Sequence, residues 1–328
     1  MKKTLKYIIL FFSLLFLFSA SLTTDNSKAL INVLLHSLNT THYQPHVLND
    51  EFSKRVFELY LKRLDYNKRF LTRSDVEQLR KYQYQIDDEV KIGSYKFFDL
   101  STEIIKSKVV EVEIFYKDLL SRPFDFEKDE IIELDPEKID YAADKAALKE
   151  AWRKSLKYQT LSRLATVLQI QEKAQVTGDT TVEIKTYQVL EEEARKKVLK
   201  SHNTWFRRMS KIERSDRLTI YINAITNTYD PNTAWLSPKD KANFDIAFSG
   251  QLEGIGAQLQ ERDGYIRVVR IIPGSASWRQ GQLKAKDIIL KVGQGTHEAV
   301  DIVDMRIDGA VKLIRGKKGT EVRLTVKK

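Results

Sequence analysis

The chain has 328 residues, of which 42% are hydrophobic and 10% aromatic, so it is long enough for about two domains with buried cores. It contains no cysteine, which excludes disulfides, thiolate metal sites and a cysteine nucleophile. The formal net charge is +10, but the basic residues are interspersed with acidic ones and form no basic stripe. Because nucleic-acid binding needs a concentrated basic surface, we do not expect a nucleic-acid partner.

The first 21 residues have the form of a secretory signal peptide. Three lysines precede the apolar run 7–18, and small residues follow at positions 19–21. The run is shorter than the roughly 20 residues that a transmembrane helix needs. We therefore expect export to the periplasm. An uncleaved segment 1–21 would be the sole membrane contact and would leave the protein associated with the inner membrane.

Residues 22–243 are predicted to form a mostly α-helical N-terminal domain. Apolar residues recur at helical spacing in stretches such as 27–38, 50–64 and 95–120. The aromatic residues Phe97, Phe98, Phe115 and Tyr116 are interpreted as helix-packing core. Asp50 is predicted to cap one helix, and Ser74 with Glu77 to form a capping box at the start of the next.

Residues 244–328 are predicted to form a second, small α+β domain. All but two of the thirteen glycines lie from position 250 onward, and β-branched runs replace the helical stripes. The runs 265–272, 287–292 and 321–326 are typical of strands, and one short helix is expected at about 307–315.

The stretch "FSGQLEGIGAQLQ" (248–260) does not have the spacing of a phosphate-binding loop. Its glycines instead allow successive backbone amides to point into one concavity, a nest that suits a carboxylate. The strand 257–260 would add an incoming peptide at its edge, and the helix 307–314 would form the opposite wall. The predicted peptide-binding residues are Leu252, Gly254, Ile255, Gly256, Ala257, Leu259, Ala310, Val311 and Ile314. The alternative is a plain glycine-rich turn, with the apolar members of this set in a core.

Two other clusters are given structural interpretations. His36, His42 and His46 lie close together but have no acidic partner at ligand spacing, so we expect neither a metal nor a cofactor. The acidic run 87–89 points in several directions around a helix. We interpret it as a solvated face and not as an acid–base pair.

Four motifs in the second domain resemble a bacterial PDZ domain of the C-terminal processing peptidase family. They are "EGIGAQL", "VVRIIPGSAS", "LKAKDIILKVGQ" and "AVKLIRGKKGTEVRLTV". Upstream, "LDYNKRFLTRSDV" (64–76) and "YDPNTAWLSPKD" (229–240) resemble the tail-specific protease branch. Two residues depart from the pattern. Lys286 stands where the family usually has glycine in a turn, so either mild strain at Lys286 or a different turn is expected there. Trp278 is bulkier than the small residues usual at its position.

The resemblance implies a periplasmic serine endopeptidase that recognises the C-terminal tails of proteins. A periplasmic adaptor lipoprotein is implied as a further partner. In the family a serine nucleophile and a lysine base lie in a catalytic domain after the PDZ domain, and that domain is expected beyond residue 328. We therefore assign no catalytic residue and expect the chain to be inactive alone. The alternative is a non-catalytic periplasmic adaptor or scaffold that uses the same groove.

Overall fold

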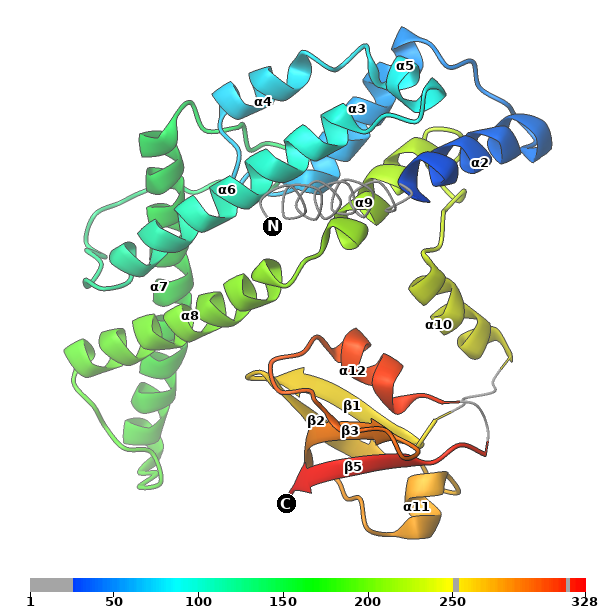
Figure 1. The fold of residues 1–328 in the computed structure, drawn as a ribbon. Coiled ribbons are helices and arrows are strands. Elements are labelled where there is room, and N and C mark those ends of the chain that lie inside the picture. Colours follow the sequence, from blue (N-terminus) through cyan, green and yellow to red (C-terminus); the bar gives the residue numbers. More distant parts are fainter. Residues whose placement is uncertain (1–25, 250–253, 317–318) are drawn as a thin grey trace, which may run out of the picture. The chain divides into compact units, whose positions relative to one another are not determined.

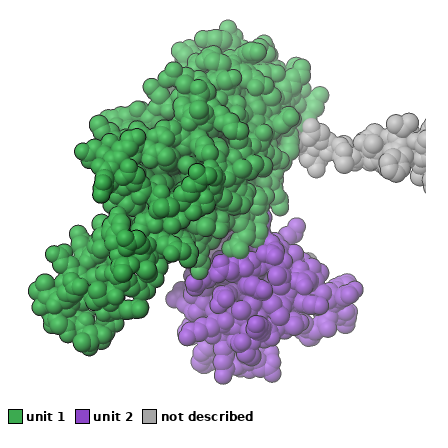
Figure 2. Space-filling view, turned by 90° about the vertical axis from the view of Figure 1, so that its left-hand side faces the viewer, with its two compact units in different colours: residues 1–235 green, residues 236–328 purple. Residues whose placement is uncertain are grey.

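The computed structural model describes residues 26–249, 254–316 and 319–328, which form two compact units. One unit extends to Trp235 and is built from helices, and the other comprises Leu236–Lys328 and contains an antiparallel sheet (Figures 1 and 2). This confirms the predicted fold class. The division falls eight residues before the expected boundary of 243, so the helix α10 (Pro238–Ser249) belongs to the second unit.

Eight helices make up the described part of the first unit. They are α2 (Asn26–Thr41), α3 (Asp50–Leu64), α4 (Arg73–Arg80), α5 (Ile86–Lys91), α6 (Lys96–Leu119), α7 (Lys145–Thr177), α8 (Tyr187–Ser210) and α9 (Arg214–Thr226). The predicted caps are wrong by one or two residues. The Asn49 side chain, not Asp50, caps α3 by accepting the Phe52 N–H at 3.0 Å. Thr72 and Asp75, not Ser74 and Glu77, form the capping box of α4.

The core of the first unit is aromatic. Tyr60 of α3 contacts Phe97 of α6 and Tyr221 of α9, with ring centroids 5.5 and 5.2 Å apart. Phe97, Phe98, Phe115 and Tyr116 are all buried, which confirms their interpretation as core. Aromatic pairs of this kind add stability beyond the area they bury.

The long helices α7 and α8 pack against each other and hold a buried histidine. His202 of α8 lies among Tyr116, Trp152 and Trp205, with ring centroids 5.6–6.0 Å away. Its Nε2 lies 3.1 Å from Gln159 Oε1, and its Nδ1 has no partner among the described residues.

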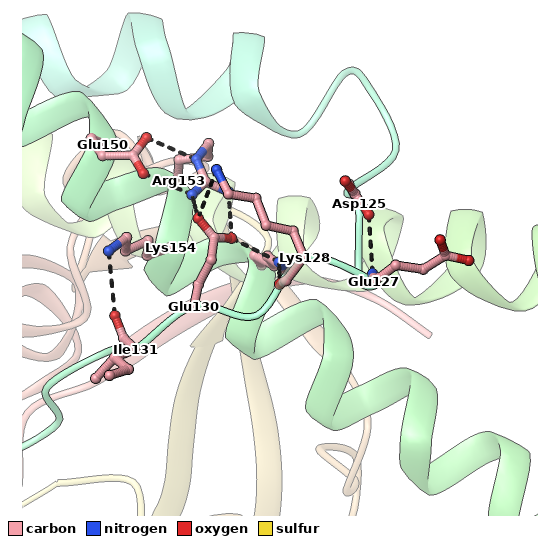
Figure 3. Close-up of polar contacts among 9 residues, drawn as sticks. Asp125, Glu127, Lys128, Glu130, Ile131, Glu150, Arg153 and Lys154 are labelled. Carbon is pink, nitrogen blue, oxygen red and sulfur yellow. Dashed lines mark hydrogen bonds and ion pairs between the residues drawn. The ribbon is translucent and has the colours of Figure 1, made fainter.

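The connector between α6 and α7 contains no helix and is fixed to α7 by ionic contacts (Figure 3). The Glu130 carboxylate pairs with Arg153 and with Lys157, whose Nζ lies 2.7 Å from Glu130 Oε2. Lys157 Nζ also donates to the Lys128 carbonyl at 2.8 Å. Hydrogen bonds from Arg153 and Lys157 lower the pKa of Glu130 to about 2.

The second unit contains a five-stranded antiparallel sheet (Figure 1). Its strands are β1 (Ala257–Arg262), β2 (Tyr265–Ile271), β3 (Ile288–Gln294), β4 (Val300–Asp301) and β5 (Val322–Lys327). They follow the order β1-β2-β3-β4, and β5 also pairs with β3. The short helix α11 (Ala276–Gln280) follows β2, and α12 (Ile307–Ile314) precedes β5. Buried apolar residues from β2, β3 and α12 form one core.

The two departures from the family pattern have different outcomes. Lys286 has a φ of 80°, in the left-handed region that favours glycine, so the expected strain is confirmed. Trp278 on α11 is 58% exposed and fills no gap in the core.

Candidate peptide-binding site

The strand β1 has one open edge. It pairs with β2 and with no other strand in the described part of the chain. The backbone groups on its other side are therefore available to an added strand.

In the loop before β1, the carbonyl groups and the amide groups differ in their hydrogen bonding. The Gly256 carbonyl accepts hydrogen bonds from Ile272 N at 2.9 Å and Ser275 Oγ at 3.1 Å. The Ile255 carbonyl accepts one from Ser277 N at 3.0 Å. By contrast, the N–H groups of 254–256 donate to no described residue. Neighbouring amides with no acceptor among the described residues are the donors that a nest for an anion such as a terminal carboxylate would need.

Gly256 is required in this loop for two reasons. Its φ is 74°, which residues with a Cβ rarely adopt. A Cβ at this position would also lie 2.0 Å from Ser275 Cβ, which is far inside van der Waals contact. The close approach of Ser275 thus fixes both the carbonyl and the shape of the loop.

The helix α12 provides the second wall beside β1. A Cβ added to Gly254 would lie 3.8 Å from Arg315 Cγ, so the C-terminal end of α12 is next to the glycine loop. Ala310 and Ile314 are 0% and 4% exposed and belong to the core beneath the wall. Val311 is half-buried, which leaves part of its side chain accessible.

The structure gives the remaining predicted residues different environments. Ile255, Ala257 and Leu259 are half-buried and pack against the core of the second unit. Leu252 lies outside the described residues. Of the predicted set, Gly254 is thus exposed, four residues are half-buried, and Gly256 is buried like Ala310 and Ile314.

The helices α10 and α12 make contacts that the sequence did not predict. Lys239 Nζ lies 2.7 Å from Asp308 Oδ2, and Arg315 Nη1 donates to Asn243 Oδ1 at 3.2 Å. Burial raises the pKa of Asp308, but Lys239 and Arg306 outweigh it and lower that pKa to about 2. No sequence spacing links residues 239 and 308, so only the folded arrangement could show this pair.

The two upstream motifs have structural roles. Within 64–76, the buried Asp65 carboxylate accepts N–H bonds from Arg69, Phe70 and Leu71 at 2.8–2.9 Å. Within 229–240, the backbone N–H of Trp235 donates to Asn223 Oδ1 at 2.8 Å. The Asp65 and Asn223 side chains thus satisfy backbone N–H groups of the two motifs and help to hold their conformation.

The histidines near α2 contact loop residues. His42 Nε2 lies 3.1 Å from Thr233 Oγ1, and His46 Nε2 lies 3.4 Å from the Tyr229 carbonyl. Within the described ranges, no three His, Cys, Asp or Glu side chains are grouped to hold a metal ion.

Taken together, an antiparallel sheet with an open edge, a glycine loop at its start and a helix alongside are the arrangement of a PDZ domain. A family model described as "Tail specific protease N-terminal domain" matches residues 34–239, and a "PDZ domain" model matches residues 245–327. The chain therefore belongs to the tail-specific protease family.

Known proteins agree with this assignment. A "Tail-specific protease" of Haemophilus influenzae is 30% identical over 291 residues, which cover 88% of this chain and 39% of that protein. The "Carboxy-terminal processing protease CtpA" of Bacillus subtilis is 40% identical over 95 residues, or 29% of this chain and 19% of that protein. The chain thus spans well under half the length of these relatives.

Among solved structures, a PDZ domain of a carboxy-terminal protease from Vibrio cholerae, in complex with peptide, is 43% identical. The match covers 23% of this chain and 76% of that one, with a TM-score of 0.23. Separately, no helix within residues 26–249, 254–316 and 319–328 is long and apolar enough to cross a membrane.

Proposed function

We propose that this chain is the substrate-recognition portion of a tail-specific serine endopeptidase and that its second unit binds the C-terminal tails of proteins. The tail adds to β1 as an antiparallel strand, and its carboxylate accepts hydrogen bonds from the amides of 254–256. Two neighbouring features carry the proposal. The strand β1 has an open edge, and the amides of 254–256 just before it have no acceptor among the described residues.

Hydrolysis is proposed for the whole protease, with a serine nucleophile and a lysine base. We assign neither residue within these 328, so the chain alone should bind tails without cleaving them. The basic, apolar and small segments of residues 1–21 support export to the periplasm. An adaptor lipoprotein and membrane contact through residues 1–21 belong to the same proposal.

The test is binding of one labelled apolar peptide in two forms, measured by fluorescence anisotropy. The form with a free C-terminal carboxylate should bind in the micromolar range, because a short added strand makes a small interface. Amidation removes the charge that the amides recognise and should weaken binding about tenfold or more. Equal affinities for the acid and the amide would refute the carboxylate site.

Two variants on α12 test the wall of the groove. Val311→Glu places a charge where we expect an apolar tail side chain and should weaken binding about tenfold or more. Lys312→Glu alters the neighbouring, exposed position. For peptides of low charge, its affinity should stay within about twofold of that of the unchanged chain. An unchanged affinity in Val311→Glu would remove α12 from the site.

Cleavage assays separate the two functional hypotheses. The natural protein, with any sequence that follows residue 328, should cleave a tailed substrate and lose that activity to a serine-directed reagent. If the natural protein binds tails but never cleaves them, the non-catalytic adaptor hypothesis replaces the protease hypothesis.

A further inference from the structure

A row of apolar side chains on α7 is exposed at the surface of the first unit. One side of this helix is buried, with residues such as Leu156 and Leu164 packed into hydrophobic cores. On another side, Tyr158, Leu161 and Leu168 are 42%, 41% and 36% exposed. Since an α-helix turns by about 100° per residue, this row lies about 120° around α7 from the buried side. It is therefore a second apolar face, separate from the one that packs within the first unit.

The row has the spacing of a coiled-coil seam. Ala165 is half-buried and lies between Leu161 and Leu168, so the apolar residues follow one another at intervals of three, four and three positions. Alternating steps of three and four keep such residues on one line along a helix, and a second helix packs against that line. A single exposed leucine needs no explanation, but a continuous row at this spacing points to a helical partner.

A charged residue stands at each end of the row. Lys154 lies four positions before Tyr158, and Glu172 lies four positions after Leu168, so both continue the same line. Glu172 is exposed and forms no ion pair with any described residue. Lys154 also has no carboxylate partner in the described part of the chain, and its Nζ donates to the Ile131 carbonyl at 3.4 Å. The row thus carries a positive charge at one end and a negative charge at the other.

These six residues are called the α7 seam: Lys154, Tyr158, Leu161, Ala165, Leu168 and Glu172. We infer that the α7 seam binds the α7 seam of a second copy of the chain, with the two helices antiparallel. The six residues lie nine, five and two positions on either side of residue 163. In a two-fold antiparallel pair, residues equally far from that point face each other. Lys154 then faces Glu172, Tyr158 faces Leu168, and Leu161 faces Ala165, and each pair occurs twice.

The charges favour this arrangement over a parallel one. In a parallel pair, Lys154 would face Lys154 and Glu172 would face Glu172, so like charges would repel at both ends. In the antiparallel pair the same residues form two ion pairs. Val176, which is 83% exposed, then comes near the end of the second copy's seam, where Ile131 is 90% exposed. The dimer would thus cover two further apolar side chains in each copy.

The first test is sedimentation velocity of the purified chain over a range of concentrations. The α7 seam is only about 27 Å long, so the interface is small and the dissociation constant should be in the micromolar range. The weight-average sedimentation coefficient should therefore rise from the monomer value toward the dimer value between about 1 and 200 μM. A chain that stays monomeric throughout would overturn the inference and leave the seam to a different partner.

A matched pair of variants assigns the dimer to the α7 seam. Leu161→Glu places a carboxylate at the centre of the apolar contact and should weaken dimerisation at least about tenfold. Thr166→Glu adds the same charge at an exposed position of α7 outside the seam and should keep the dissociation constant within about twofold. Both positions are exposed, so circular dichroism should show the same helix content in the two variants. An unchanged dissociation constant in Leu161→Glu would place any dimer contact elsewhere and overturn the inference.

Charge reversal tests the antiparallel register. Lys154→Glu alone and Glu172→Lys alone each replace both attractions with repulsions, so each variant should dimerise at least about fivefold more weakly. An equal mixture of the two variants restores both opposite-charge pairs, so a heterodimer should form with nearly the affinity of the unchanged chain. Fluorescence energy transfer between differently labelled variants measures this heterodimer. A mixture that associates no more strongly than either variant alone would overturn the inference. None of these outcomes depends on tail binding by the second unit.

Discussion

Lys157 Nζ lies 2.7 Å from Glu130 Oε2, and each side chain is only 10% exposed, although the two residues come from a helix and a connector without helix. Arg153 pairs with the same carboxylate. Glu130→Gln should therefore lower the Tm of the first unit, because it removes the charge between two cations and leaves Lys157 buried beside a neutral group. Asp129→Asn, at an exposed neighbouring position, should leave the Tm unchanged.

The same contact predicts how that difference changes with pH. The pKa of Glu130 falls from 4.5 to about 2 in the folded chain. A carboxyl whose folded pKa is depressed stabilises the fold above its unfolded pKa, and this contribution disappears as the pH falls through the folded pKa. The Tm advantage over Glu130→Gln should thus be full at pH 7 and shrink between about pH 5 and 2. A constant difference over that range would contradict the prediction.

His202 should make the first unit sensitive to mild acid. Burial, together with the nearby Arg69 and Arg163, lowers its pKa from 6.5 to about 4. Between these values the unfolded chain binds a proton that the folded chain does not, so stability is lost as the pH falls from about 6.5 to 4. The expected loss is on the order of 2–3 kcal/mol.

Urea unfolding at several pH values measures this effect. His202→Gln should lower stability at pH 7 but flatten the dependence between pH 6.5 and 4. His36→Gln, at an exposed position on α2, should retain the full dependence. An equal slope in His202→Gln and the unchanged chain would assign the acid sensitivity to other groups.

The contact between Gly256 and Ser275 predicts a local defect in the second unit. Gly256→Ala meets both the positive φ and the clash with Ser275 Cβ, so the loop must move and tail binding should weaken at least about tenfold. Gly274→Ala is the matched control, because it has a φ of 77° but no atom within 4 Å of its added Cβ. It should cost about 1–2 kcal/mol of stability and leave tail affinity nearly unchanged. Equal affinity losses would mean that the clash is unimportant.

Local sequence rules predicted the parts of this fold that depend on neighbouring residues. Helical spacing predicted which aromatic residues are buried. Residues at that spacing lie on one face of a helix, and this apolar face packs against the core. The cap residues were displaced by one or two positions, because Asn49, Asp50, Thr72 and Ser74 are all good caps and the chain's entry angle selects among them.

Features that join distant segments could not be predicted in this way. The Glu130 contact depends on how the connector lies across α7, and the Lys239–Asp308 pair on how α10 meets α12. Helical spacing placed Ala310 and Ile314 on one face but did not show whether that face met the groove or the core. The glycine loop was recognisable because its conformation requires particular residue types.

Lys286 allows a test of backbone strain at a position where the family usually has glycine. Its φ of 80° is costly for a residue with a Cβ, while its N–H still donates to the Val268 carbonyl at 2.8 Å. Lys286→Gly keeps that hydrogen bond and removes the steric cost, so the second unit should gain about 1 kcal/mol in urea unfolding. Lys284→Gly in the same turn has no positive φ to relieve, so it should be neutral or destabilising. A loss of stability in Lys286→Gly would show that contacts of the lysine side chain outweigh the strain of its backbone.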